Sequence, residues 1–457
     1  MLQRVNDTIQ GGMCAILNFF WRYTKKIAPS LRGRLLTISF MMISICAYCY
    51  MILPISVHLL WKCVIGAFVM FLILLFSIDR EIYPVKWNKG VVFFWLMFGF
   101  LRFLSGFTAS IEFLPLACIW LIGFPFIFLV WNNRRDYLVL FSHLYTGFLY
   151  PTIAFFVLSI SFVPIGENAY TGIIGNTNAV GLHISAIFPL AFAYFLLKKN
   201  ARKRERIINV ICIWLSIAFA FYSRGRTVML VITGVIIIGF LAEIIFLEGR
   251  FQNLMKKAVV LIIGSIVTIV ICIPVNGFLT SNLPNYIYEN SVEEETTNVN
   301  DAVSGFLDRV EGKDKAAPGL NNYSSGRIGI WIEAINNLNF KGNPSRNHIV
   351  TDRNGDVGNN AHNVFIQFAY DNGIVAGVCF LLLIIFSTIT TIRGCFFSKK
   401  NKRLYILLLL ITVAYLCEGV VTSINLPFLY VISFVYYSSF AVLFDGELKE
   451  ELKIREE

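Results

Sequence analysis

The sequence predicts an all-α integral membrane protein with about twelve transmembrane helices. Hydrophobic residues fill 57% of the 457 positions and charged residues only 15%, whereas soluble domains carry roughly a quarter charged residues. The apolar runs are long enough to cross a hydrocarbon core of about 30 Å, and they lack the strict alternation of barrel strands. Because no soluble basic domain is present to hold a duplex, the net charge of +11 does not indicate nucleic-acid binding.

Twelve apolar runs are the candidates for these helices. They cover residues 35–55, 59–78, 90–108, 113–131, 137–163, 178–197, 206–222, 227–246, 257–279, 373–392, 404–421 and 424–444. If the N-terminus is cytoplasmic, the basic loops "NNRRD", "KKNARKRER" and "RGCFFSKKNKR" all lie on the cytoplasmic side, as the positive-inside rule requires. The long basic start without a small-residue cleavage site predicts an N-terminus that is retained.

These runs divide the chain into five parts. They are a basic cytoplasmic arm at 1–34, nine spans at 35–279, a large external loop at 280–361, a histidine-bearing helix with three spans at 362–444, and a cytoplasmic tail at 445–457. The second half of the loop contains "RIGIWIEAINNL", whose apolar residues recur at helical spacing. They are Ile328, Trp331, Ile332, Ile335 and Leu338. We expect an amphipathic helix here that lies on the membrane surface or caps the bundle.

Two external stretches carry arginines where the positive-inside pattern disfavours them. In "YSRGRT", Arg224 and Arg226 occupy a tight connection between two spans, and Ser-Arg-Gly lets the backbone turn. In "SSGRIGIW", Arg327 enters the expected amphipathic helix, which Ser324 or Ser325 can cap. The alternative for the arginines of the connection is snorkelling to lipid headgroups. We favour Arg224 and Arg327 as a clamp for phosphate oxygens, because two guanidinium groups suit that geometry and a helix N-terminus favours anions.

A histidine with asparagines around it opens the helix after the loop, in "GNNAHNVFIQFAYDNG" at 358–373. Neutral histidine is the side chain best matched to accept a proton near neutral pH. The alternative is a capping or hydrogen-bonding role, but the arginines on the same side favour His362 as a general base. Asn363, Gln367 and Tyr370 follow at helical spacing, so we expect a polar edge that positions the acceptor.

Two further ionisable residues lie within predicted spans. Arg102 and Glu418 are costly in lipid and are expected to face a polar interior, either as supporting groups of the site or as a pair. Other patterns favour structural interpretations. "DRNGD" at 352–356 lacks the ligands of a calcium loop, and Cys46 and Cys49 lie inside a span, where cysteine is a small apolar residue. We therefore predict neither a metal nor a cofactor site.

The order of "SRGR", "SGRIGIW" and "AHNVFIQFAYDNGIVAG" resembles the bacterial O-antigen ligase and O-antigen polymerase superfamily. "GIIGNTNAVGLH" at 172–183 resembles that family's Gly-Asn-x-Asn segment, in which the second asparagine is Asn178. The resemblance implies a GT-C-type glycosyltransferase of the bacterial inner membrane. Such an enzyme takes glycan from undecaprenyl diphosphate at the periplasmic face without a metal ion.

The resemblance also implies roles for individual residues. His362 matches the family's base, Arg224 and Arg327 match its two arginines, and Glu418 occupies a position that is often acidic. Arg226 departs from the family, where a small or apolar residue is commoner, so the division of labour between Arg224 and Arg226 stays open.

Several functions remain open within and outside the superfamily. A ligase would move the glycan to lipid A core in lipopolysaccharide biosynthesis, whereas a polymerase would move a growing glycan onto one more repeat unit. We place the ligase first because of the long external loop. A flippase or transporter would have ionisable groups near the bilayer midplane, and a scaffold protein would leave the paired arginines unexplained.

Overall fold

The computed structural model describes residues 2–52, 59–166, 169–198, 202–247, 251–283, 327–344, 350–351, 357–358 and 360–448. Within these ranges, eleven helical segments are long and apolar enough to span a membrane. They are α2 (Pro29–Ile52), α3 (Leu59–Ser77), α4 (Lys89–Thr108), the continuous α5 (Phe113–Cys118), η1 (Ile119–Gly123) and α6 (Phe124–Arg134), α7 (Tyr137–Phe162), α8 (Thr177–Leu197), α9 (Lys203–Ser223), α10 (Arg226–Leu247), α11 (Phe251–Asn282), α16 (Ile374–Phe397) and α17 (Lys402–Val421). The predicted all-α membrane fold is confirmed.

The remaining elements are short or lie at the ends of the bundle. They are α1 (Leu2–Thr24), η2 (Gly172–Ile174), α14 (Arg327–Asn336), α15 (Val364–Asn372), α18 (Val431–Phe444) and the antiparallel pair β1 (Val350–Thr351) and β2 (Val357–Gly358). Of the large loop expected at 280–361, Ser324, Ser325 and the 352–356 turn lie outside the described residues.

The twelfth predicted span, at 424–444, is wrong in length. Its helix, α18, covers only Val431–Phe444, which is 14 residues or about 21 Å. Pro427 disfavours helical geometry at the residue before it, and Ser433 donates a hydrogen bond to the Ile424 carbonyl across the non-helical entry. Every residue of α18 is buried, as expected for a short core helix surrounded by longer spans.

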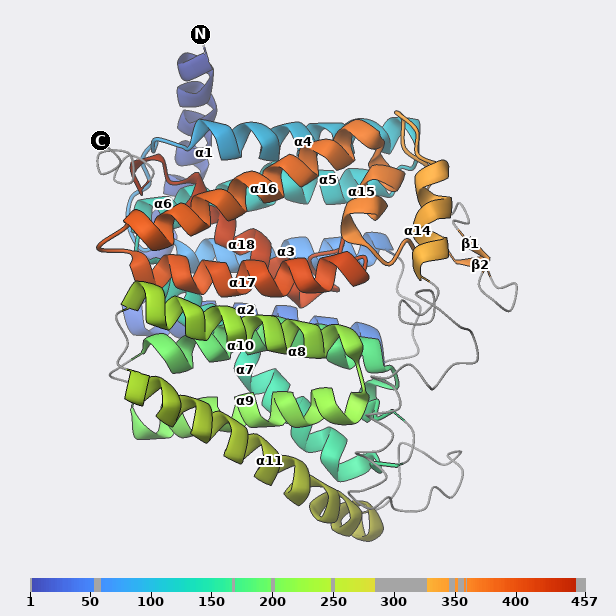
Figure 1. The fold of residues 1–457 in the computed structure, drawn as a ribbon. Coiled ribbons are helices and arrows are strands. Elements are labelled where there is room, and N and C mark those ends of the chain that lie inside the picture. The colour runs from blue at the N-terminus through green and yellow to red at the C-terminus, as the bar shows by residue number, and fades with distance from the viewer. Residues whose placement is uncertain are drawn as a thin grey trace.

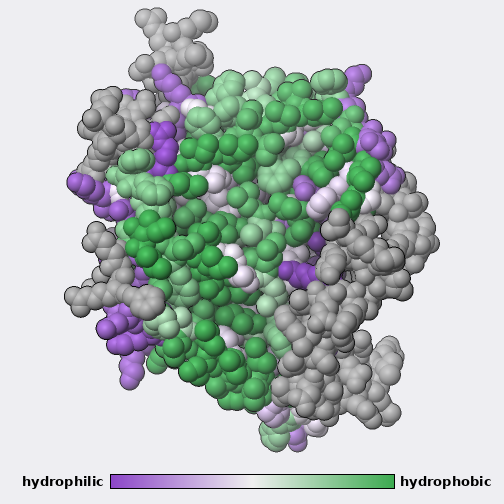
Figure 2. All heavy atoms as spheres, viewed as in Figure 1, coloured by the Kyte–Doolittle hydropathy of each residue, from purple (hydrophilic) through white to green (hydrophobic). Residues whose placement is uncertain are grey.

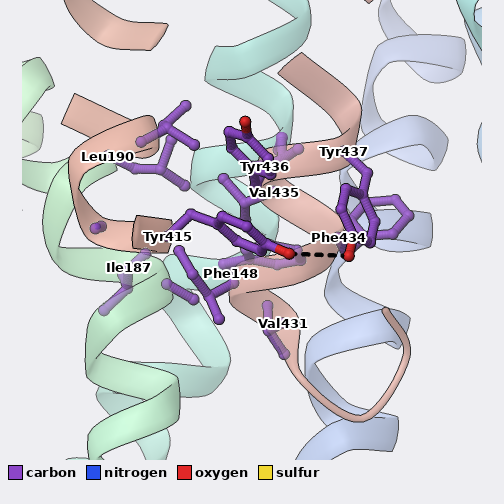
Figure 3. Close-up of a cluster of buried hydrophobic side chains, with 14 of the residues drawn as sticks. Phe148, Ile187, Leu190, Tyr415, Val431, Phe434, Val435, Tyr436 and Tyr437 are labelled. Atoms are coloured by element: carbon purple, nitrogen blue, oxygen red, sulfur yellow. Dashed lines mark hydrogen bonds between the residues drawn. The ribbon is translucent and has the colours of Figure 1, made fainter. Parts of the chain in front are cut away.

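Aromatic side chains that satisfy their own polar atoms fill the centre of the bundle. Tyr415 of α17 stacks on Tyr436 of α18 with ring centroids 4.0 Å apart, and its hydroxyl lies 3.0 Å from that of Tyr437 (Figure 3). Trp95 and Trp120 stack in the same way, and each indole donates a hydrogen bond to the other's carbonyl. Pairing of this kind lets Tyr and Trp be buried in a span without an unsatisfied donor.

The bundle has two distinct ends. α14, α15 and the β1–β2 pair lie together at one end, which we call the histidine end, and the chain termini lie toward the opposite end (Figure 1). The opposite end also carries the connections at 135–136 and 398–401 together with Lys198 and Arg202, and we call it the basic end. Apolar residues cover the broad face between them, with hydrophilic residues along both margins (Figure 2).

The N-terminal arm predicted at 1–34 is largely helical. α1 runs across the direction of the spanning helices (Figure 1), and α2 already begins at Pro29. Gln10 and Asn18 of α1 exchange hydrogen bonds with the backbone of Val85 and Ile82, in the connection between α3 and α4. Polar side chains thus attach the arm to the basic end of the bundle.

A backbone clasp holds α14 against the junction of α15 and α16. Asn343 donates its backbone N–H to the Tyr370 carbonyl, and Ile374 donates its own to the Asn339 carbonyl, each at 2.9 Å. Gly342 and Gly373 have φ values of +83° and +92° and approach the facing backbone closely. The clasp requires glycine at both positions, because a side chain there would be strained and would also meet backbone atoms.

The expected amphipathic helix is present as α14, and part of its predicted apolar face is exposed. Ala334 is fully buried with Ile330 and Leu338 packed beside it, whereas Ile332 and Ile335 are 56% and 51% exposed. Ala334, Ile330 and Leu338 therefore form the side of α14 that packs with Tyr370 and Ile366 of α15. The exposed isoleucines leave an apolar surface at the membrane boundary.

We predict that Gly342→Ala destabilises the clasp, because the new Cβ would lie 2.3 Å from the Asp371 carbonyl oxygen at a positive φ. Overpacking and strain of this kind cost about 1–3 kcal/mol. Gly329→Ala in α14 is the matched control, since its Cβ would meet open space. Amide hydrogen exchange of α14 should accelerate in the first variant and not in the second. Equal exchange in both would contradict the account.

Candidate functional site

His362 lies before the first turn of α15. The sequence had instead predicted that His362 opens the helix. Its φ is +47°, which is left-handed and uncommon for a residue with a side chain, and α15 begins only at Val364. Its backbone N–H donates to the Asn360 side chain at 2.8 Å. A residue held in this conformation is over-determined by its surroundings, and such positions cluster at functional sites.

Asn363 fixes this turn from both sides. Its side-chain oxygen caps α15 by accepting from the N–H groups of Phe365 and Ile366, and its Nδ2 donates to the Val420 carbonyl of α17. Its own N–H donates to Ser423 Oγ. Asn363 therefore positions the backbone next to His362, and these bonds use one of the two hydrogens of its Nδ2.

Gln367 and Asp371 extend the same network along α15. Gln367 Oε1 accepts from the Ala361 N–H at 2.7 Å, and Gln367 Nε2 donates to Asp371 Oδ1 at 2.8 Å. Burial raises the pKa of Asp371 to about 7, although hydrogen bonds from Gln367 and Asn425 and the charge of Arg102 act against it. The polar edge that the sequence predicted thus faces the protein interior and supports the His362 turn.

Arg102 belongs to α4 and lies where α4 packs against α15. Its guanidinium carbon is 5.1 Å from the centroid of the Phe368 ring, and the charge of Asp371 acts on it. Its Nε has no hydrogen-bond partner among the described residues. Of the two alternatives for Arg102 and Glu418, the pair is not formed, because Glu418 bonds to Ser185 and Thr422 and Arg102 lies near Asp371.

Glu418 instead balances the arginine of α14. It is buried in α17, accepts from Ser185 Oγ of α8 at 2.6 Å and bonds to Thr422. The charges of Glu418 and Arg327 act on each other. A buried carboxylate requires an opposite charge of this kind. Glu418 therefore connects the arginine to two spanning helices.

Arg327 is in turn the charged group that acts on His362. Burial lowers the pKa of Arg327, Glu418 raises it and Arg226 lowers it. Burial also lowers the pKa of His362 below the ordinary histidine value, and the charge of Arg327 lowers it further. The imidazole is therefore neutral at neutral pH, in the form that can accept a proton.

The connection between α9 and α10 is built differently from the expectation. Arg224 itself adopts the left-handed conformation, with φ of +50°, and caps α9 through its N–H to the Phe221 carbonyl. Gly225 has an ordinary φ, so the prediction that glycine makes the turn is wrong. Arg226 is the first residue of α10 and is near enough to affect Arg327. The turn thus brings Arg226 to the same site.

Asn178 lies at the start of α8, on the helix that also carries Ser185. Asn176 caps this helix by accepting from the N–H groups of Asn178 and Ala179. Asn178 is exposed, and seven residues separate it from Ser185, so the two share a helix face about 10 Å apart along the axis. The Gly-Asn-x-Asn segment therefore places its second asparagine above the Ser185–Glu418 hydrogen bond.

The structure brings most of the predicted residues to the histidine end. The charge of Arg327 acts on His362, and the charges of Glu418 and Arg226 act on Arg327, while Arg102 lies on the other side of α15. Sequence reasoning missed Asp371, whose signal was its spacing of four residues from Gln367 on one helix face. Within the described ranges, no three His, Cys, Asp or Glu side chains gather as metal ligands would.

The fold and this site define an all-α integral membrane protein whose buried and half-buried ionisable side chains gather at one end of the bundle. Residues 211–381 match the family model described as O-antigen ligase. This match confirms the resemblance to the O-antigen ligase and polymerase superfamily that was seen in the sequence. No curated protein matches the chain. The match includes Arg224, Arg226, Arg327 and His362, whereas Glu418 lies outside it.

We predict opposite effects of glycine at the two arginines of the α9–α10 connection. At Arg224 the left-handed backbone should make Arg224→Gly more stable than Arg224→Ala by about 1 kcal/mol, because both remove the guanidinium and only alanine keeps the strained Cβ. At Arg226, which is helical, alanine should be the more stable of the pair. Thermal unfolding midpoints of the four variants test this. The same order at both positions would contradict the assigned turn.

Proposed function

We propose that this chain is a glycosyltransferase that moves a glycan from a polyprenyl diphosphate carrier to an acceptor hydroxyl. The observation that supports the proposal is the electrostatic coupling of Arg327 to both His362 and Glu418, with His362 and Arg327 inside the segment that matches O-antigen ligase. A neutral histidine can take a proton, and a guanidinium can hold the oxygens of a diphosphate. These are the two groups that such a transfer needs.

The reaction is a displacement at the anomeric carbon of the donor sugar. His362 takes the proton of the acceptor hydroxyl, whose oxygen forms a new bond to that carbon as the bond to the diphosphate oxygen breaks. Arg327, with Arg224 and Arg226 at the facing connection, holds the charge that develops on the leaving diphosphate. Glu418 keeps Arg327 in place and balances its charge before the donor arrives.

The positioning network of α15 supports this chemistry without entering it. Asn363, Gln367 and Asp371 fix the backbone around His362, and Asn178 projects from α8 toward the same end. A general base must lie within hydrogen-bond reach of its proton, so a rigid turn contributes directly to the rate. We propose that these residues position His362, and that Arg102 supports α15 by packing on the Phe368 ring.

Undecaprenyl diphosphate is the proposed carrier, and lipid A core is the proposed acceptor of a ligase in the bacterial inner membrane. The positive-inside pattern supports a position of the histidine end outside the cytoplasm. A repeat-unit polymerase is the alternative, and the family match accommodates both. The two differ in acceptor, so assays with lipid A core and with a second carrier-linked glycan distinguish them.

We expect Arg327→Ala to slow transfer about 10²–10³-fold in vesicles that hold the purified protein, a carrier-linked donor and an acceptor. Arg327→Lys should restore only part of the rate, because an ammonium lacks the planar fork that binds two oxygens. Lys341→Ala is the control, since it removes an exposed cation from the same end of the bundle. Wild-type rates for Arg327→Ala would refute the diphosphate role.

A further inference from the structure

A groove at the basic end of the bundle is separate from the candidate site. It encloses about 520 Å³ between α7, α8 and α17, and none of the site residues described above lines it. Its lining comes from the first turns of α7 and α17 and the last turns of α8, at the opposite ends of α8 and α17 from Asn178 and Glu418. The proposed transfer therefore does not account for it.

The floor of this groove is apolar and its rim is cationic. Phe141, Leu190, Ala193 and Leu407 are buried along the floor. Leu138 and Val139 are each 49% exposed on the rim. Because the lining belongs to membrane-spanning helices, the occupant must be a molecule that dissolves in the hydrocarbon.

Two cations mark the mouth of the groove. Lys198 caps the C-terminus of α8 and is paired with Glu205 at 3.2 Å, while Arg403 in the first turn of α17 is exposed and has no ion pair with a described residue. The rim therefore carries a net positive charge. Ser142 and His143 lie about one helical turn further in, where they offer polar atoms between the charged mouth and the apolar floor.

We propose that this groove binds an anionic glycerophospholipid of the cytoplasmic leaflet. The phosphate lies at Arg403 and Lys198, the ester groups lie near Ser142 and His143, and one acyl chain lies along Leu190, Ala193 and Leu407. Basic pockets between spanning helices on the cytoplasmic side suit such headgroups, and that leaflet carries the anionic lipids. The site is independent of the proposed transfer, because it lies at the other end of the bundle.

The lipid that the purified full-length protein retains tests this proposal. The protein is placed in nanodiscs of equal phosphatidylglycerol and phosphatidylcholine, then extracted into mild detergent and weighed by native mass spectrometry. The wild type should retain phosphatidylglycerol in preference to phosphatidylcholine. Arg403→Gln should reduce that preference about fivefold, the amount expected for one cation near a headgroup.

A second variant tests the acyl-chain part of the groove. Val139→Trp should displace the lipid by filling the groove from its exposed rim, so the fold is not at risk. Lys256→Gln removes an exposed cation from the same end, and Ile262→Trp adds an indole to an exposed, lipid-facing position outside the groove. Both controls should retain lipid as the wild type does.

Three outcomes would overturn the proposal. The first is retention of phosphatidylglycerol by Arg403→Gln and Val139→Trp at the wild-type level. The second is equal retention of phosphatidylcholine by the wild type. The third is a protein partner or a second copy of the chain that occupies the groove in place of lipid.

Discussion

The hydrogen bonds of Asn363 are the interaction on which the candidate site depends. The chain is not helical between Ala361 and Asn363, and this turn is buried or half-buried, so unpaired backbone groups there would be costly. Asn363 satisfies the first N–H groups of α15 and joins the turn to the end of α17 through Val420 and Ser423. His362 can hold a strained backbone because its neighbour is fixed in this way.

The charges around this turn are arranged as two separate sets. Glu418 balances Arg327 on the side that faces α8 and α10, and Asp371 lies near Arg102 on the side that faces α4. Each buried charge in a span requires an opposite charge or hydrogen bonds, so the pairs must form within the protein. The separation leaves the charge of Arg327 free to act on His362, whose basicity it lowers, and in the proposed transfer the same charge would hold the diphosphate.

Much of the fold follows from local patterns, and much of the site does not. The long apolar runs predicted the spans that the structure contains, because length and hydropathy are sufficient for a helix in lipid. The same signal overextended α18, since buried core helices and spans are equally apolar. The sequence predicted that glycine makes the turn at Arg224 and that His362 opens a helix. Both residues are left-handed instead, and a hydrophobic pattern does not indicate a left-handed backbone.

The partners of buried polar residues were the least accessible to sequence reasoning. Arg102 and Glu418 were both expected in a polar interior, but only tertiary packing decides that one lies near Asp371 and the other near Arg327. Asn363 and Gln367 were expected to face an acceptor. In the structure, Asn363 donates to the distant Val420 carbonyl, and Gln367 accepts from the Ala361 N–H across the turn. Residue types indicated the place of the site, and long-range contacts determine the roles.

The pH dependence of kcat/KM for glycan transfer tests the central claim, that His362 is a base under the influence of Arg327. Because the pKa of His362 is lowered, wild-type activity should fall only at a pH below the ordinary histidine value of about 6.5. Arg327→Gln should raise that pKa and move the fall to higher pH, and His362→Ala should abolish it while reducing the rate about 10²–10⁴-fold. An identical acidic fall in His362→Ala, or no displacement in Arg327→Gln, would contradict the account.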